Sequence, residues 1–140
     1  MAEIYDGTKM GTTMVMAYID GDDITVMHCG DSRCYVYDRD KNIKYVTADH
    51  NAGDYMGAPI TRCFFAGHPK KAEPEVKTFK VSTDDRIFRC SDGVYPCMAP
   101  DILCDRMMVD KQLEDIMDTF KFMCEKFSEN NYSGILIKID

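Results

Sequence analysis

The chain has 140 residues and a mass of 16.0 kDa, the size of one ordinary domain, so residues 1–140 are predicted to form a single unit. It is 45% hydrophobic and 29% charged, a composition typical of globular proteins and not of disordered ones. The 24 acidic residues outnumber the 17 basic ones, and no basic patch indicates a nucleic-acid partner. No apolar run approaches the ~20 residues that span a bilayer, and no signal pattern opens the chain. We therefore expect a soluble cytoplasmic domain.

The sequence contains seven cysteines and three histidines. An odd cysteine count without any CxxC pair argues against a disulfide framework and against a structural zinc site. We expect the cysteines to be small buried hydrophobes in a reducing compartment. The histidines are scattered in the sequence and form no metal-binding motif, so structural roles are predicted for them. These residues are Cys29, Cys34, Cys63, Cys90, Cys97, Cys104 and Cys124, and His28, His50 and His68.

The first third of the chain predicts successive β-strands. Apolar and β-branched residues fill 11–19 and 24–29, and the Asp-Gly-Asp sequence at 20–22 between them predicts a hairpin turn. Two further strands are expected at 33–37 and 43–47. This close spacing predicts an antiparallel meander and not an alternation of strands and helices.

The middle of the chain is predicted to be less regular. Glycine and proline indicate a loop at 48–59, followed by a short strand at 60–65 and a polar connector at 67–75. Alternating apolar and polar residues predict a strand at 76–81, and another follows at 86–90.

One helix is predicted near the C-terminus, over about 110–127, with Asp110 as its N-cap. Its apolar residues recur at steps of three and four and form one stripe, which we expect to belong to a core. After this helix, 134–139 is expected to be a buried last strand. The residues of the stripe are Leu113, Ile116, Met117, Phe120, Met123, Cys124 and Phe127.

Three short acidic turns are the candidate sites for chemistry, at 30–33 (GDSR), 48–50 (ADH) and 91–93 (SDG). Asp31 and Asp92 each lie beside a glycine where a predicted strand ends. A carboxylate in such a place projects beyond the sheet and can bind a hard cation such as Mg²⁺ or Mn²⁺. Taken one at a time, these aspartates are more typical of ordinary turns than of metal sites.

The order of the motifs provides a stronger signal than any single turn. The chain resembles the PP2C-type metal-dependent protein serine/threonine phosphatases, whose domains carry GTT, GDSRxY, LTxDH, TRxxG, DRxLLCSDG and DNxTxxxV in that order. The resemblance extends from about Met10 to Ile139. The matching segments are GTT at 11–13, GDSRCY at 30–35, VTADHN at 46–51, ITR at 60–62, DRIFRCSDGV at 85–94 and ENNYSGILIKI at 129–139.

The resemblance implies an α+β fold, a PP2C-like antiparallel β-sandwich with flanking helices, of which this chain is a partial domain. It also implies hydrolysis of phosphoserine and phosphothreonine by two Mg²⁺ or Mn²⁺ ions that activate a bridging water. Asp92, followed by Gly93, matches a metal-binding aspartate of the family. Asp31 matches a family aspartate that lies near an additional, more weakly bound metal ion. No residue is assigned a catalytic role outside this metal set, and the substrate-binding residues stay unassigned.

Four departures from the family pattern weaken the predicted metal centre. The N-terminal third, which holds the bridging DG pair and a phosphate-binding arginine, is expected to be missing. Asn130 is a degenerate position, since it replaces a metal-binding carboxylate with an amide, and Pro96 stands where the family often has an aspartate. The segment between His50 and Ile60 is short, so the family's flap is largely missing.

Two functions from different classes follow from these departures. The first is a truncated or degenerate phosphatase domain that binds metal weakly and is weak or inactive alone. The second is an inactive pseudophosphatase that serves as a protein-binding module. The expected partners are a phosphoprotein or regulatory protein, and no nucleic acid or membrane. A homo-oligomer or pairing with a missing N-terminal segment is also expected, through the strand at 14–17 and the stripe at 113–127.

Overall fold

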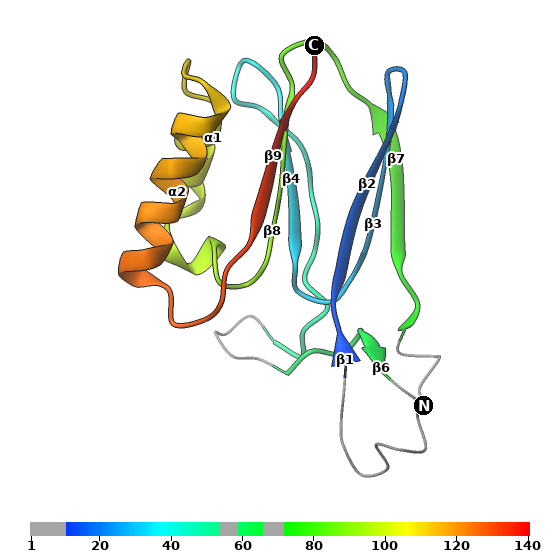
Figure 1. The fold of residues 1–140 in the computed structure, drawn as a ribbon. Helices are drawn as coiled ribbons and strands as arrows, with labels where there is room; N and C mark the ends of the chain where they lie inside the picture. The colour runs from blue at the N-terminus through cyan, green and yellow to red at the C-terminus, as the bar shows by residue number, and fades with distance from the viewer. Residues whose placement is uncertain (1–10, 54–58, 66–71) are drawn as a thin grey trace.

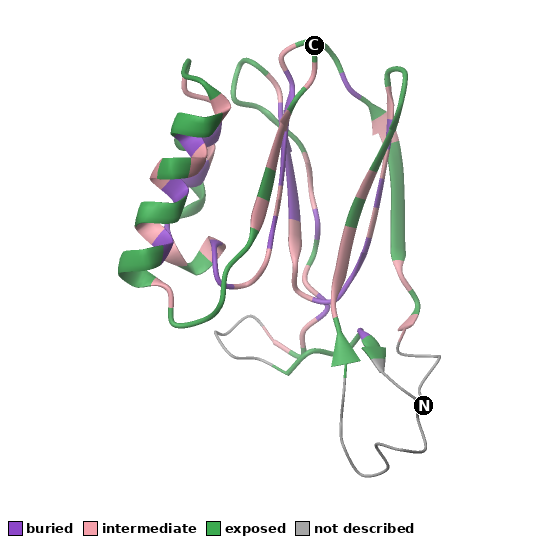
Figure 2. Cartoon of the chain, in the orientation of Figure 1, coloured by how far each residue is buried: buried purple, intermediate pink, exposed green. Residues whose placement is uncertain are grey.

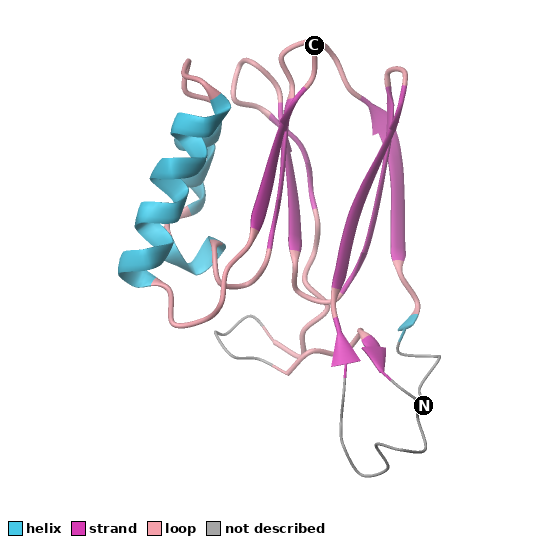
Figure 3. Cartoon of the chain, viewed as in Figure 1, coloured by secondary structure: helices cyan, strands magenta, loops and turns pink. Residues whose placement is uncertain are grey.

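A computed structural model describes residues 11–53, 59–65 and 72–140 of the protein (Figure 1). Two antiparallel sheets pack face to face, and two helices cover the outer face of one of them (Figure 3). The predicted α+β sandwich with flanking helices is confirmed. No helix in the described ranges is long and apolar enough to cross a lipid bilayer.

Each sheet combines strands that are distant in the sequence. The first has the order β2 (Met14–Asp20), β3 (Asp23–Cys29) and β7 (Glu75–Lys80). The second has the order β5 (Ile43–Val46), β4 (Arg33–Tyr37), β8 (Arg86–Cys90) and β9 (Gly134–Lys138). A small ladder joins β1 (Gly11–Thr12) to β6 (Phe64–Phe65). A 3₁₀ turn, η3 (Tyr95–Cys97), precedes the helices α1 (Pro100–Met107) and α2 (Leu113–Phe127).

The predicted meander is wrong at one point, because the chain changes sheets between β3 and β4. The hairpin of β2 and β3 forms as predicted, but β4 then pairs with β5 and β8 in the other sheet. Gly30 makes this crossing with a φ of 117°, which side chains other than hydrogen rarely allow. A Cβ atom at this position would also collide with the side chain of Thr13.

The interior between the two sheets is apolar. Alternation along each strand directs one set of side chains inward, as the sequence predicts for half-buried strands. Burial of these side chains drives the packing of the sheets. They are Ile24, Val26, Cys34, Val36, Val81 and Ile87.

A second core lies between the four-stranded sheet and the helices. Phe88 of β8 packs on Phe120 of α2 with ring centroids 4.9 Å apart, and Ile116 and Cys124 lie on the same buried face of the helix. The stripe at 113–127 is thus largely covered inside this domain. The expectation that it contacts a partner is corrected, although Phe127 at its end is exposed.

The helical region differs from the prediction in two respects. The helix begins at Leu113 with Gln112 as its N-cap, so Asp110 does not cap it. Helix α1 was not expected, because only Leu103 and Met107 are buried along its eight residues and they form too short an apolar pattern.

Several strands are shorter or more exposed than predicted. Of the strand expected at 60–65, only Phe64–Phe65 forms a strand, β6. Ile60 forms a single β-bridge to Asn51. The last strand, β9, lies at a sheet edge and is half exposed instead of buried. Parts of the loop at 48–59 and of the connector at 67–75 lie outside the described residues.

The outer face of the three-stranded sheet is the open side of the molecule (Figure 2). Met16, Tyr18 and Val76 are exposed there, with Tyr18 at 61% of its full accessibility. No helix from the described ranges covers this face (Figure 1).

Candidate metal centre

The two acidic turns meet at one end of the four-stranded sheet. Strands β4 and β8 are antiparallel, and Arg33 at the start of β4 pairs with Cys90 at the end of β8. Asp31 and Asp92 each lie two residues beyond this pair, so both turns emerge from the same end of neighbouring strands. The pKa of the Asp31 carboxyl is raised by burial and then by the negative charge of Asp92. Like charges that raise a pKa in this way lie close together.

The segment before β9 lies beside the second acidic turn. A Cβ atom at Gly93 would collide with the main-chain oxygen of Asn131, so only glycine allows this close approach. The amide of Ser91 donates a hydrogen bond of 3.0 Å to the carbonyl of Ser133, which fixes the two segments side by side. The main chain of Asn130 is held in its own turn, since its carbonyl accepts a bond of 2.9 Å from the Ser128 hydroxyl.

An arginine and two supporting residues hold the first acidic turn in place. Arg33 donates two bonds to Asp49, of 2.9 Å from Nε and 2.7 Å from Nη2. Its guanidinium carbon lies 3.5 Å from the centre of the Tyr95 ring. The Tyr95 hydroxyl donates a bond of 3.0 Å to the main-chain oxygen of Asp31. The aromatic ring is therefore clamped between the arginine and the turn that carries Asp31.

The sequence patterns indicate no role for Tyr95 and no partner for Asp49. Tyr95 lies in η3, 64 residues from Asp31 along the chain, so no local pattern could connect them. The arginine neutralises Asp49 by a bidentate ion pair, which leaves Asp31 and Asp92 as the carboxylates available at this end of the sheet.

The residues of these turns fit one divalent cation. Mg²⁺ and Mn²⁺ take oxygen ligands, and Asp31 and Asp92 supply two charged ones while water completes the shell. Burial and then the charge of Asp92 raise the pKa of Asp31, and a cation between the two carboxylates would relieve their repulsion. In the described part of the chain we find no further carboxylate positioned to bridge two ions, so these turns do not fit a two-metal cluster by themselves.

A second group of possible ligands lies elsewhere, at the crossing between the sheets. Atoms of His28, His50 and Glu75 lie within 4.8 Å of one another. The two imidazole rings are stacked, however, with centroids 4.4 Å apart and planes inclined by only 14°. Because an imidazole lone pair lies in the plane of its ring, one ion cannot meet both lone pairs in this arrangement.

The hydrogen bonds of the two histidines also indicate structural roles. His28 Nε2 lies 2.8 Å from the carbonyl oxygen of Ala48 and donates to it. The amide of Gly30 donates a bond of 3.1 Å to His50 Nδ1, and burial lowers the pKa of His50, which favours the neutral ring. Both histidines connect the crossing at Gly30 to the loop at 48–50. His68 lies outside the described residues.

Comparison with known proteins identifies the family. Residues 3–138 match the sequence profile of protein phosphatase 2C. The chain belongs to the protein phosphatase 2C family. The serine/threonine phosphatase stp of Listeria welshimeri is 26% identical over 148 residues, an alignment that covers 92% of this chain and 54% of that protein. The chain thus spans about half the length of this relative.

Solved structures of the family show the same fold. The Mycobacterium tuberculosis serine/threonine phosphatase PstP/Ppp has a TM-score of 0.81 at 19% identity, covering 94% of this chain and 61% of that one. The S. agalactiae serine/threonine phosphatase has a TM-score of 0.82 at 22% identity, and the alignment covers 99% of this chain and 62% of that one. The PstP catalytic domain in complex with two manganese ions has a TM-score of 0.78 at 18% identity, and the alignment covers 99% of this chain and 64% of that one.

Proposed function

We propose that this chain supplies part of the active centre of a metal-dependent protein serine/threonine phosphatase. The observation that carries the proposal is the meeting of Asp31 and Asp92 at neighbouring strand ends, with mutual repulsion that a cation relieves. Membership of the protein phosphatase 2C family and the serine/threonine phosphatases among its relatives support the reaction class. The substrate is accordingly a phosphoserine or phosphothreonine in a protein.

Each residue of the candidate site has a distinct task in this proposal. Asp31 and Asp92 hold one Mg²⁺ or Mn²⁺ ion, which when bound activates water and neutralises phosphoryl charge. Gly93 permits the Asn131 carbonyl to lie against the turn. Asn130 contributes no charge, so the loss of a carboxylate there weakens the site. Tyr95 holds the main chain of Asp31 and thereby positions its carboxylate.

The proposal also covers the assembly in which the chain works. Residues 1–140 form a single PP2C-like unit that is weakly active or inactive alone, because two carboxylates hold one ion loosely. The open face of β2, β3 and β7 and the edge strands of the two sheets support pairing with a further segment or a second copy. Cys34, Cys90 and Cys104 are free thiols, which supports a reducing, cytoplasmic compartment.

Metal titration tests the proposed site directly. Calorimetry should detect Mn²⁺ binding on the order of millimolar, since weak carboxylate sites bind in that range. The Asp92→Asn variant should lose it, and Asp110→Asn, which changes an exposed aspartate outside the acidic turns, should keep it. Binding that persists in Asp92→Asn, or no binding in the unmodified chain, would contradict the proposal.

A phosphatase assay on p-nitrophenyl phosphate complements the titration. The chain alone should show little or no turnover above a metal-only blank. Robust Mn²⁺-dependent turnover that Asp92→Asn abolishes would confirm the reaction class and show that the chain needs no further carboxylates.

A further inference from the structure

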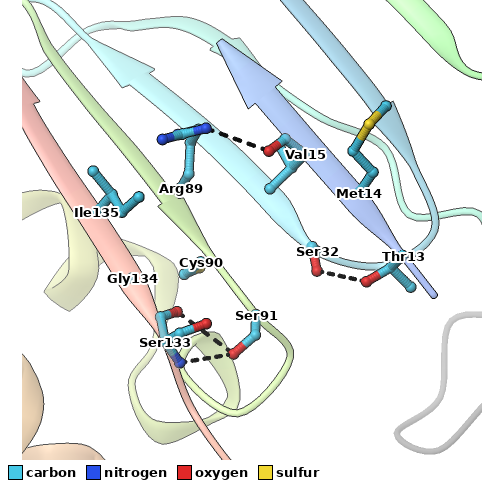
Figure 4. A pocket seen from close by; sticks show the side chains of 10 residues that line it. All are labelled: Thr13, Met14, Val15, Ser32, Arg89, Cys90, Ser91, Ser133, Gly134 and Ile135. Atoms are coloured by element: carbon cyan, nitrogen blue, oxygen red, sulfur yellow. Dashed lines mark hydrogen bonds between the residues drawn. The ribbon is translucent and has the colours of Figure 1, made fainter.

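A pocket of about 380 Å³ opens between the edge of the three-stranded sheet and the last two strands of the other sheet (Figure 4). Its walls come from β2, from the turn before β4, and from β8 and β9. Small-molecule sites are typically of this size. The lining residues that carry the argument are Thr13, Val15, Ser32, Arg89, Ser91 and Ser133.

Arg89 is the one arginine or lysine among the described residues that line the pocket. It points from β8 toward β2, and its Nη1 donates a long bond of 3.4 Å to the main-chain oxygen of Val15 (Figure 4). Its Nε is buried and has no hydrogen-bond partner among the described residues. A guanidinium carries five N–H donors, so most of its capacity is unused.

The charge of Arg89 is also unbalanced. None of the ion pairs among the described residues includes Arg89. Among the described residues, no aspartate or glutamate lines the pocket. A half-buried cation without a counter-ion is unfavourable, and a bound anion removes that cost.

Hydroxyl groups on the opposite walls add donors. Ser32 and Thr13 lie 2.9 Å apart, oxygen to oxygen, and their shared hydrogen bond uses only one of their two hydroxyl hydrogens. The Ser91 oxygen accepts a bond of 3.0 Å from the Ser133 amide, and its own hydrogen makes only a marginal bond of 3.5 Å to the Ser133 carbonyl. Donors therefore face the pocket from both sheets.

We propose that this pocket binds a tetrahedral oxyanion, inorganic phosphate or a phosphate monoester, on Arg89 and the hydroxyls of Ser32 and Ser91. These donors lie on separate segments and approach from different directions. They therefore suit a tetrahedral ion, whose oxygens point in several directions, better than they suit a planar carboxylate. Ser32 and Ser91 are the chain neighbours of Asp31 and Asp92, so the pocket adjoins the candidate metal centre. The inference goes beyond the proposed function, because the binding requires neither a metal nor hydrolysis.

An NMR titration with inorganic phosphate in EDTA, at constant ionic strength, tests the pocket without any metal contribution. The Arg89 Nε–H signal and the Ser91 and Ser133 amides should shift in a saturable manner. Arg89→Gln should weaken binding about tenfold or more, because hydrogen bonds from a charged donor are lost. Arg106→Gln should not change it, since Arg106 is exposed on α1 at the helix-covered face of the sheet.

Other ligands and a second variant distinguish the possible occupants of the pocket. Phosphoserine that binds at least as well as phosphate supports a monoester as the occupant, and binding of phosphate alone supports the free ion. Ser91→Ala should weaken phosphate binding severalfold, which keeps the test valid if Arg89→Gln does not fold. Acetate that binds as tightly as phosphate, or phosphate binding unchanged in Arg89→Gln and Ser91→Ala, would overturn the proposal. Failure here leaves the Mn²⁺ titration of the acidic turns unaffected, so the two proposals fail separately.

Discussion

The described part of the protein has two clusters of side chains with metal-ligand chemistry, and they are built in opposite ways. The carboxylates of Asp31 and Asp92 come from turns at the end of one sheet and repel each other. The imidazoles of His28 and His50 stack at the crossing between the sheets, and each has a main-chain hydrogen bond. The first cluster brings two negative charges together, whereas in the second one nitrogen of each ring already has a main-chain partner.

The difference shows that proximity of ligand atoms does not define a metal site. The histidine cluster has its ligand atoms within 4.8 Å of one another, yet its nearly parallel rings cannot share an ion. The carboxylates have oxygen lone pairs in several directions and a like-charge repulsion that a cation relieves. Charge and orientation therefore favour the acidic turns, and the following predictions test that preference.

The largest expected effect is on stability, at the histidine cluster. His50→Ala removes the acceptor of the buried Gly30 amide and leaves a cavity under the sheet crossing. We expect a loss of about 2–3 kcal/mol in the free energy of unfolding, from the unsatisfied donor and lost packing. Urea denaturation measures this loss. A change below about 0.5 kcal/mol, the usual size for a surface substitution, would show that the histidines do not hold the crossing.

The next effect is on metal affinity. Asp92→Asn should weaken Mn²⁺ binding about tenfold or more, which corresponds to about 1.4 kcal/mol. Glu75→Gln should leave it within about twofold, because the Glu75 side chain is half exposed and belongs to the histidine cluster. Calorimetry on both variants measures the contrast. A greater loss in Glu75→Gln than in Asp92→Asn would reverse the assignment of the site.

A smaller effect is expected from the residue that supports the acidic turn. Arg33→Lys replaces two parallel bonds to Asp49 with one and removes the planar group stacked on Tyr95. We expect a loss of about 1 kcal/mol in stability, since charged bidentate pairs exceed ordinary surface ion pairs. Thermal unfolding measures it. Mn²⁺ affinity should fall in the same variant, and an unchanged affinity would show that the clamp on Tyr95 does not position Asp31.

The smallest effect is in the pH dependence of stability without metal, where the two clusters have opposite signs. The pKa of Asp31 is raised above 3.8, so the folded state binds more protons just above that pH, and stability falls as pH rises through this window. Asp31→Asn should therefore be more stable than the unmodified chain at neutral pH, with a gap that closes toward pH 3.8.

His50 gives the opposite slope. Its pKa is lowered below 6.5, so the unfolded state binds more protons there, and stability is lost as pH falls below 6.5. Urea denaturation across pH 4–7 measures both slopes. An Asp31→Asn variant that is less stable than the unmodified chain at neutral pH would show that burial and the charge of Asp92 do not penalise the ionised Asp31.

The strands were predictable from the sequence because alternation and turn residues are local signals. The strands at 24–29, 33–37 and 86–90 appear within one residue of their predicted bounds. Helix α1 has too few buried residues to show a period, and the true N-cap, Gln112, is not a residue type that favours caps. A local sequence pattern predicts an element only when enough of that element's own residues are buried.

The site was less predictable, because its contacts join distant segments. The motifs identified Asp31 and Asp92, but the clamp on Tyr95 depends on folding 64 residues of intervening chain. The role of Arg89 depends on how β8 and β2 face each other across the two sheets. Such pairings are fixed by the packing of whole sheets, which no spacing within the sequence encodes.

We propose above all that a divalent cation binds between the two acidic turns. Paramagnetic broadening of amide signals by substoichiometric Mn²⁺ locates the ion within the folded chain and needs no substitution. The account predicts that the amides around Asp31 and Asp92 broaden first, with Gly93 among them. Broadening centred on His28, His50 and Glu75, with the acidic turns unaffected, would contradict it.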